Sequence, residues 1–147
     1  MNTRKSYQLA NQFRSAILSV PKSDFPWNSS MAMSQFPAGC CGDATRTLAT
    51  YLYRKSGIIY DYALGACDGL GCLGSHAWLE ISETAIDITA NQFNDRGFCL
   101  PEIHVGPRLS FHNLFTVTLS SDARHTALNN NGSLDGVYAC IENHLRP

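Results

Sequence analysis

A cysteine, a histidine and an aspartate follow one another in this sequence in an order that could support nucleophilic catalysis. Cys41 lies in FPAGCCGDATRT at the start of a predicted helix, His76 opens HAWLEI, and Asp87 lies in AIDIT. A thiolate is a far better nucleophile than a thiol, and the free N–H groups of a first helical turn favour the anion. Such a nucleophile needs a base, and the base needs a group that orients it. The sequence therefore predicts Cys41 as nucleophile, His76 as base and Asp87 as its orienting partner.

The spacing of the histidine and the aspartate predicts that they meet across a β-hairpin. HAWLEI and AIDIT are typical of two short strands, whose side chains alternate between the faces of a sheet. If the turn centres on residues 81–82, His76 lies directly opposite Asp87, with Cβ atoms about 5 Å apart. If the turn is formed by residues 83–84, Asp87 faces Glu80 and the pair is lost. The apolar pattern does not distinguish these registers, and the chemistry favours the first.

Two amphipathic helices are predicted in the first half of the chain. Apolar residues recur at helical spacing over residues 5–20, and Pro21 ends this segment. Residues 41–56 show the same spacing, and Gly57 is expected as the C-cap. Residues 21–39 contain prolines and serines and are expected to form an irregular loop. The second helix would therefore begin at Cys41 and present it at an N-terminus.

The rest of the chain is predicted to form an antiparallel sheet and a last helix. Runs rich in β-branched and aromatic residues predict strands at 58–65, 76–81, 85–89 and 109–119. Apolar residues at helical spacing between 134 and 145 predict the closing helix. This order of elements is typical of an α+β fold, and the whole chain, residues 1–147, is expected to be a single domain.

Composition restricts the classes of partner. The chain has 147 residues, of which 44% are hydrophobic and 16% are charged, and its formal net charge is −1. This balance favours neither a nucleic acid nor a membrane surface as the partner. No long apolar run and no apolar signal core are present, so we expect a cytoplasmic protein, or one exported without a classical signal peptide. The six cysteines are then expected to be mostly free thiols in a reducing compartment.

Taken together, the motifs of this sequence resemble those of a known group of enzymes. GCCGDATRTLATYLYRKSG, YALG, SHAWLEI and AIDITANQF, within about residues 36–93, resemble the core of the transglutaminase-like cysteine enzymes of the papain-like group. Those enzymes show Gly-x-Cys opening a helix, His-Ala-Trp opening a strand, and Asp on the following strand. Gly39-Cys40-Cys41 matches the first motif with Cys41 as nucleophile, while His76 and Asp87 match the base and third member. The resemblance implies a catalytic helix packed on a small antiparallel sheet.

The resemblance also implies a reaction class. It points to a thiol-dependent acyl-transfer enzyme that acts on an amide or peptide bond through a thioester, as a cysteine peptidase, an amidase or a glutamine deamidase. A protein or peptide is the expected substrate, and no cofactor is expected. A protein cross-linking transglutaminase and a non-catalytic binding domain that keeps the fold are the alternatives. The superfamily includes bacterial toxins and effectors, so an exported effector role is also open.

Four further residues are expected to support the oxyanion or contact the substrate. Gln35 lies six residues before Cys41, where papain-like enzymes place an oxyanion-hole glutamine. Cys40 is the neighbour of the nucleophile and is expected to pack under the start of the helix. Trp78 is expected in the core or in the wall of a cleft on the His76 face, and Gln92 is expected to line that cleft.

The remaining cysteines and histidines allow other uses. Cys67, Cys72 and His76 could contribute three zinc ligands, with Cys40 or Cys41 as the fourth. Zinc sites more often show tighter, paired spacing, so no metal is predicted. A disulfide between Cys67 and Cys72 would close the loop between two strands. The other four histidines are expected to be surface or structural residues: His104, His112, His125 and His144.

Overall fold

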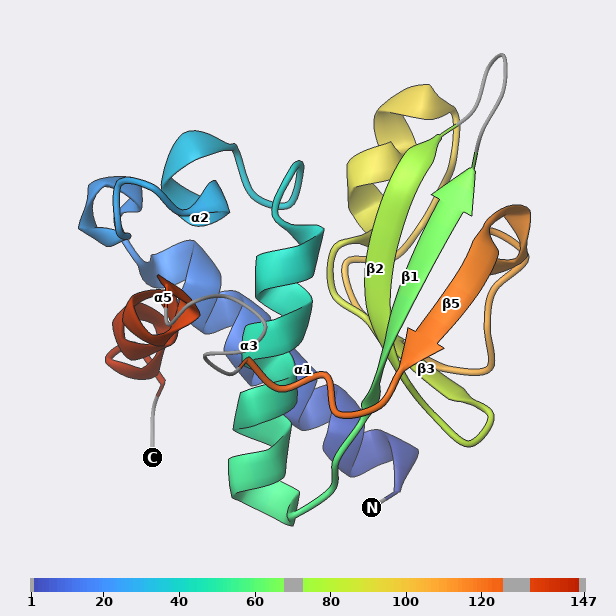
Figure 1. The fold of residues 1–147 in the computed structure, drawn as a ribbon, viewed down its shortest axis with the longest axis horizontal. Coiled ribbons are helices and arrows are strands. Elements are labelled where there is room, and N and C mark those ends of the chain that lie inside the picture. The colour runs from blue at the N-terminus through green and yellow to red at the C-terminus, as the bar shows by residue number, and fades with distance from the viewer. Residues whose placement is uncertain (1, 68–72, 126–132, 146–147) are drawn as a thin grey trace.

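The described residues of this computed structural model are 2–67, 73–125 and 133–145, and they form a mixed α+β fold (Figure 1). In chain order their helices and strands are α1 (Thr3–Ser19), η1 (Lys22–Asp24), α2 (Ser30–Met33), α3 (Cys41–Ser56), β1 (Asp61–Cys67), β2 (Gly74–Ile81), β3 (Thr84–Asp87), η2 (Ala90–Arg96), β4 (His104–Gly106), η3 (His112–Leu114), β5 (Thr116–Ser120) and α5 (Ser133–Glu142), where η marks a 3-10 helix.

The helices and the sheet form two halves of the molecule. The strands of the described residues pair antiparallel in the order β4-β3-β2-β1-β5. α3 lies between α5 and the sheet, and its N-terminal end is at the same end of the molecule as the start of β2 (Figure 1). Within the described part of the chain, no helix is both long and apolar enough to cross a membrane.

The helix predicted over residues 5–20 is confirmed as α1. The Asn2 side chain caps it by accepting a hydrogen bond from Lys5 N at 2.8 Å. The predicted apolar stripe is buried, and Phe13 stacks on Tyr51 of α3 with 5.3 Å between ring centroids. Burial of this stripe, rather than helix propensity, accounts for most of the stability of such a helix.

The helix predicted over residues 41–56 is confirmed with the same bounds as α3. Gly57 ends it in the left-handed conformation, with φ of 74°, which confirms the predicted C-cap. The Thr45 hydroxyl donates a hydrogen bond to the Ala77 carbonyl of β2 at 3.3 Å. α3 is therefore tied to the strand that carries the candidate base.

The prediction of an irregular loop over residues 21–39 is partly wrong. The segment contains η1 and α2, which are too short to produce a periodic apolar pattern. Ser29 caps α2, and Asp43 in the first turn of α3 accepts hydrogen bonds from the backbone N–H and hydroxyl of Ser30. The peptide bond between Phe36 and Pro37 is cis. The segment therefore reaches α3 through defined turns.

The strand predicted over residues 109–119 is also partly wrong. Its first half forms η3 and only its second half forms β5. Phe111, His112 and Phe115 are buried together, which corresponds to the spacing of a turn of helix rather than the alternation of a strand. The three-residue strand β4 was not predicted, since it is too short to show a pattern.

The β2–β3 hairpin has neither of the two predicted registers. Leu79 pairs with Ile86, and residues 82–83 form the turn, with Ser82 at a φ of 52°. This register places Asp87 in line with Trp78 and diagonal to His76. It is shifted by two residues from each predicted register. Because a shift of two residues leaves every side chain on the same face of the sheet, the predicted faces are unchanged. Diagonal neighbours lie about 7–8 Å apart, which long side chains can bridge.

Two apolar clusters cover the two faces of the sheet. The larger one joins α1, α3 and α5 to the side chains of Leu79, Ile86 and Ile88. The smaller one lies on the opposite face and is largely aromatic. Gly65 of β1 pairs with His76, and its missing side chain leaves space that Phe115 and Trp78 fill. The members of the smaller cluster are Ala63, Trp78, Ala85, Ala90, Phe93, Phe111 and Phe115.

Replacement of Gly65 by alanine is expected to destabilise the fold by about 1–3 kcal/mol through overpacking. A Cβ atom there would lie 2.7 Å from Phe115 Cβ and 3.1 Å from an edge atom of the Trp78 ring. Urea denaturation measures the change. As a control, Ala66→Val adds bulk at the next, exposed position of the same strand and should change stability by less than about 0.5 kcal/mol. Equal effects of the two substitutions would contradict this account of Gly65.

Candidate functional site

The structure brings the three residues of the predicted nucleophile–base–orienter set together. Cys41 is the first residue of α3 and is partly exposed, whereas His76 and Asp87 are buried on one face of β2 and β3. His76 Nε2 lies 2.8 Å from Asp87 Oδ2. The Cys41 thiol lies close enough to the His76 ring to influence its protonation. The contact between histidine and aspartate therefore forms despite the error in the predicted register.

The Asp87 carboxylate accepts three hydrogen bonds. Its Oδ2 accepts from His76 Nε2 and from His112 Nε2, each at 2.8 Å, and its Oδ1 accepts from the Thr89 backbone N–H at 3.0 Å. Burial alone would raise the pKa of Asp87, but the positive charge of His76 and the hydrogen bonds from both imidazoles hold it well below its usual range. Asp87 is therefore a buried, fully hydrogen-bonded anion.

The environment of His76 favours its protonated form. Burial alone would lower the pKa of His76, but the charge and hydrogen bond of Asp87, together with Cys41, raise it to about 9. Because Nε2 donates to Asp87, Nδ1 is the nitrogen left for proton exchange with Cys41. The Gln92 amide lies 3.5 Å from this Nδ1 and is fixed by a 3.1 Å hydrogen bond to the Thr89 carbonyl. Gln92 therefore lies beside the candidate base, and the cleft that it was expected to line stays a prediction.

The first turn of α3 leaves backbone donors beside Cys41. The helical hydrogen bonds begin with Ala44 N–H to the Cys40 carbonyl, and Cys40 provides no side-chain cap, in contrast to the caps of α1 and α2. Such free N–H groups favour a negative charge. Gly39 turns the chain into this position with φ of 73°, and a Cβ there would lie 2.7 Å from Ser34 Oγ. Both the conformation and the space at Gly39 require glycine.

Tyr62 of β1 also lies at this helix end, and no role was predicted for it from the sequence. A Cβ on Gly42 would lie 3.3 Å from the Tyr62 hydroxyl, and the Arg46 guanidinium lies 4.0 Å from the centroid of the Tyr62 ring. Burial raises the pKa of Tyr62, whereas Arg46 opposes this shift. Tyr62 belongs to a predicted strand, but strand alternation alone could not show that its face meets the first turn of α3.

Cys40 is buried and lies away from the candidate reaction centre. Its thiol lies 3.5 Å from the Ser30 carbonyl oxygen and 3.4 Å from that of Ala38, and both act as acceptors. Burial, which outweighs the hydrogen bond to Ser30, raises the pKa of Cys40 to about 11. Cys40 is thus a protonated thiol that packs under the helix start and has no exposed surface.

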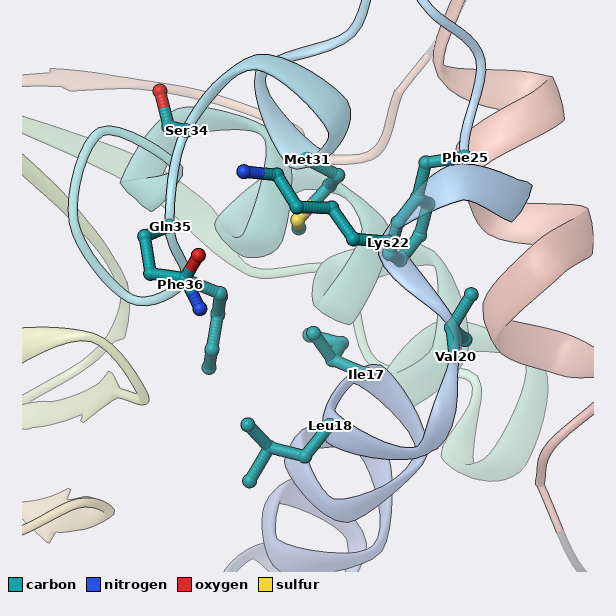
Figure 2. Close-up of a pocket in the computed structure, with 9 residues that line it drawn as sticks. All are labelled: Ile17, Leu18, Val20, Lys22, Phe25, Met31, Ser34, Gln35 and Phe36. Carbon is teal, nitrogen blue, oxygen red and sulfur yellow. The ribbon is translucent and has the colours of Figure 1, made fainter.

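Gln35 lines a separate pocket and is not brought to Cys41. The pocket has a volume of about 110 Å³, and Gln35 forms its wall beside Phe36, facing Ile17 and Leu18 of α1 (Figure 2). Lys22 extends across the same pocket (Figure 2). Among the described residues, the Gln35 side chain forms no hydrogen bond with Cys41 or His76. The structure therefore provides no contact that supports the oxyanion role predicted for Gln35.

Trp78 lies behind the candidate base. It is fully buried on the His76 face, and its ring centroid lies 4.6 Å from that of His112. The indole N–H donates to Glu80 at 2.7 Å, and Glu80 forms a two-pronged ion pair with Arg108. Trp78 is therefore a core residue, as the first of its two predicted positions stated, and a role for it as the wall of a cleft stays a prediction.

The thiols other than Cys41 give little support to a metal site. Cys67 is disulfide-bonded, and Cys72, with which a disulfide was considered as an alternative to free thiols, lies outside the described residues. The described part of the chain contains no group of three or more His, Cys, Asp or Glu side chains arranged to hold a metal ion. Four of the described cysteines are free thiols: Cys40, Cys41, Cys99 and Cys140.

No family model, curated protein or solved structure matches this chain. Function must therefore be inferred from the side-chain geometry of the chain itself. That geometry combines a thiol at a helix N-terminus, an imidazole with one nitrogen directed to a buried carboxylate, and first-turn N–H groups that have no side-chain cap from Cys40. These groups can transfer a proton and hold a developing negative charge at the same place.

The raised pKa of His76 predicts that stability depends on alkaline pH. A folded-state pKa above the unfolded value of about 6.5 contributes stability that is complete below pH 6.5 and is lost as the pH rises through 9. The free energy of unfolding should fall over this window by at most about 3 kcal/mol. In His76→Gln this dependence should disappear, whereas His144→Gln, at an exposed position, should keep it. Urea denaturation between pH 6 and 9.5 tests this, and a flat wild-type profile would contradict the ion-pair assignment.

Proposed function

We propose that this protein is a cysteine acyl-transfer enzyme that cleaves an amide or peptide bond, with a papain-like, transglutaminase-like core. The observation that carries the proposal is the buried His76–Asp87 pair beside Cys41 at the start of α3. A hydrolase of this kind would be a peptidase, an amidase or a glutamine deamidase. The expected substrate is a protein or peptide.

The first chemical step would be attack by the cysteine. Transfer of the Cys41 thiol proton to His76 Nδ1 gives the thiolate and the imidazolium that the environment of His76 favours. Sγ then forms a bond to the carbonyl carbon as the carbonyl electron pair moves onto oxygen. The Asp87 carboxylate stabilises the resulting imidazolium through Nε2. The first-turn N–H groups of α3 lie beside Sγ, where they can donate to the oxyanion. The Gln92 amide lies beside His76 Nδ1, at 3.5 Å.

The second step would release the amine and regenerate the thiol. The oxyanion re-forms the carbonyl, the C–N bond breaks, and protonated His76 gives its proton to the departing ammonia or amine. His76 then takes a proton from water, whose oxygen attacks the thioester carbon. The acid product leaves as the C–S bond breaks, and the proton returns to the Cys41 sulfur. Each step uses side chains present in this chain and water, and an amine in place of water would give a transamidation product.

Selective alkylation tests the nucleophile without knowledge of the substrate. Iodoacetamide at pH 6 should label Cys41 at least about tenfold faster than Cys99, an exposed free thiol, since an ordinary thiol is almost fully protonated there. His76→Ala should reduce the rate at Cys41 to that of Cys99. Peptide mass spectrometry measures each site. Cys99→Ser is the matched control and should leave the Cys41 rate unchanged, whereas equal slow labelling of both thiols would refute the enzyme assignment.

A screen for turnover tests the reaction class. Incubation with a proteome-derived peptide library should produce new carboxylates, through deamidation or peptide cleavage, that mass spectrometry can identify. Cys41→Ala should reduce their formation by at least about 10³-fold, as expected for loss of a nucleophile. Cys99→Ser should retain it. Addition of a primary amine separates hydrolysis from transfer, because only a cross-linking transglutaminase would incorporate the amine in preference to water, and selective alkylation without turnover would favour a binding domain.

A further inference from the structure

A second histidine contacts the carboxylate of the candidate site. His112 was expected to be a surface or structural residue, but it is fully buried in η3, with its Nε2 2.8 Å from Asp87 Oδ2. This is the same oxygen that His76 uses, also at 2.8 Å. Two imidazoles from different parts of the chain therefore share one acceptor atom.

The hydrogen bonds of His112 define its tautomer. The Leu109 backbone N–H donates to His112 Nδ1 at 3.0 Å, so this nitrogen carries a lone pair and no proton. The ring proton is therefore on Nε2, where it is donated to Asp87. In this arrangement His112 accepts one hydrogen bond from the backbone and donates one to Asp87, whereas the same carboxylate and Cys41 favour His76 as a cation.

In the part of the chain that the structure describes, few groups near His112 could donate a hydrogen bond to Asp87 in its place. The Trp78 ring covers one side, at 4.6 Å between centroids, and the His104 ring of β4 lies 5.8 Å away. His104 Nε2 is directed to the Pro107 carbonyl at 2.7 Å. Among the described residues, the other titratable groups near the two imidazoles are Cys41 beside His76, and Glu80, which is paired with Arg108.

We propose that His112 is a positioning residue that holds the Asp87 carboxylate and limits how strongly it attracts the proton of His76. This role rests on the proposed function, because it concerns the residue that would act as base and acid. When two donors share one carboxylate oxygen, each hydrogen bond is weaker than the bond that a single donor would form. A base that must also release its proton to a leaving group works best when neither state is strongly favoured. The second imidazole therefore makes proton release from His76 easier.

The pH dependence of Cys41 alkylation tests this role. The alkaline step of the rate profile reports loss of the His76 proton. His112→Phe keeps the ring shape and removes the donor. In this variant the midpoint of the alkaline step should rise by at least about half a pH unit, since Asp87 then bonds His76 alone. In His112→Gln, whose amide N–H can replace Nε2–H, the midpoint should stay within about 0.2 pH units of wild type. His104→Phe is the neighbouring control and should leave the midpoint unchanged.

The outcomes separate this inference from the proposed function. An unchanged or lowered midpoint in folded His112→Phe would overturn the positioning role, while fast wild-type alkylation would leave the proposed function standing. If His112→Phe does not fold, a shifted midpoint in His112→Gln overturns the role. Histidine ¹⁵N NMR of the wild type gives a third measurement: the His112 ring should carry its proton on Nε2, and an Nδ1–H tautomer would overturn the inference. This spectrum decides the tautomer even if Cys41 proves unreactive and the proposed function fails.

Discussion

The organisation of the site depends on one buried negative charge, the carboxylate of Asp87. A charge removed from water is costly unless opposite charges and hydrogen bonds compensate for it. Here the compensation comes from three separate parts of the chain, namely His76 of β2, His112 of η3 and the Thr89 backbone. These parts must be correctly placed for Asp87 to be buried as an anion. The folding of the sheet and the assembly of the site are therefore the same event.

A second, cationic anchor acts from the helical half. Arg14 of α1 is buried, and it donates to the Ile88 carbonyl at 3.0 Å and to Asn91 Oδ1 at 3.3 Å. Its guanidinium also lies over the Phe36 ring, 5.2 Å from its centroid. α1 thus fixes both the segment after Asp87 and the loop that leads to Cys41. α1 contributes no group to the proposed chemistry. Through Arg14 it nevertheless holds the segment after Asp87 and the loop before Cys41 in position relative to each other.

The sequence was informative where periodicity and residue type agree. α3 and its N-terminal cysteine were predicted because a regular apolar stripe, a flanking glycine and a helix stop coincide at residues 41–57. The shared face of His76 and Asp87 followed from strand alternation, which does not change when the register shifts by two residues. The register itself depends on the backbone conformation of the turn at Ser82, which the apolar pattern does not encode.

The residues missed by sequence analysis are placed by tertiary contacts alone. His112 lies in LSFHNLF, where aromatic residues favoured a strand, and only its burial against Trp78 gives it a role. Tyr62 reaches the first turn of α3 because of how the sheet packs on the helix. Gln35, by contrast, was predicted from its distance to Cys41 along the chain, but after the turns between them, including the one at Gly39, it lines a pocket with Ile17 and Phe36. Sequence separation in such a loop does not determine separation in space.

The β2–β3 hairpin also determines where this chain can change in length during evolution. A residue added to the exposed turn at Ser82 leaves every cross-strand pair intact. A residue added within β3 ahead of Asp87 would instead turn the rest of the strand over, exchanging the carboxylate with Ile86 or Ile88. The charge would then lie in the apolar cluster against the helices. Insertions and deletions should therefore accumulate in the turn and be excluded from the few residues on either side of it.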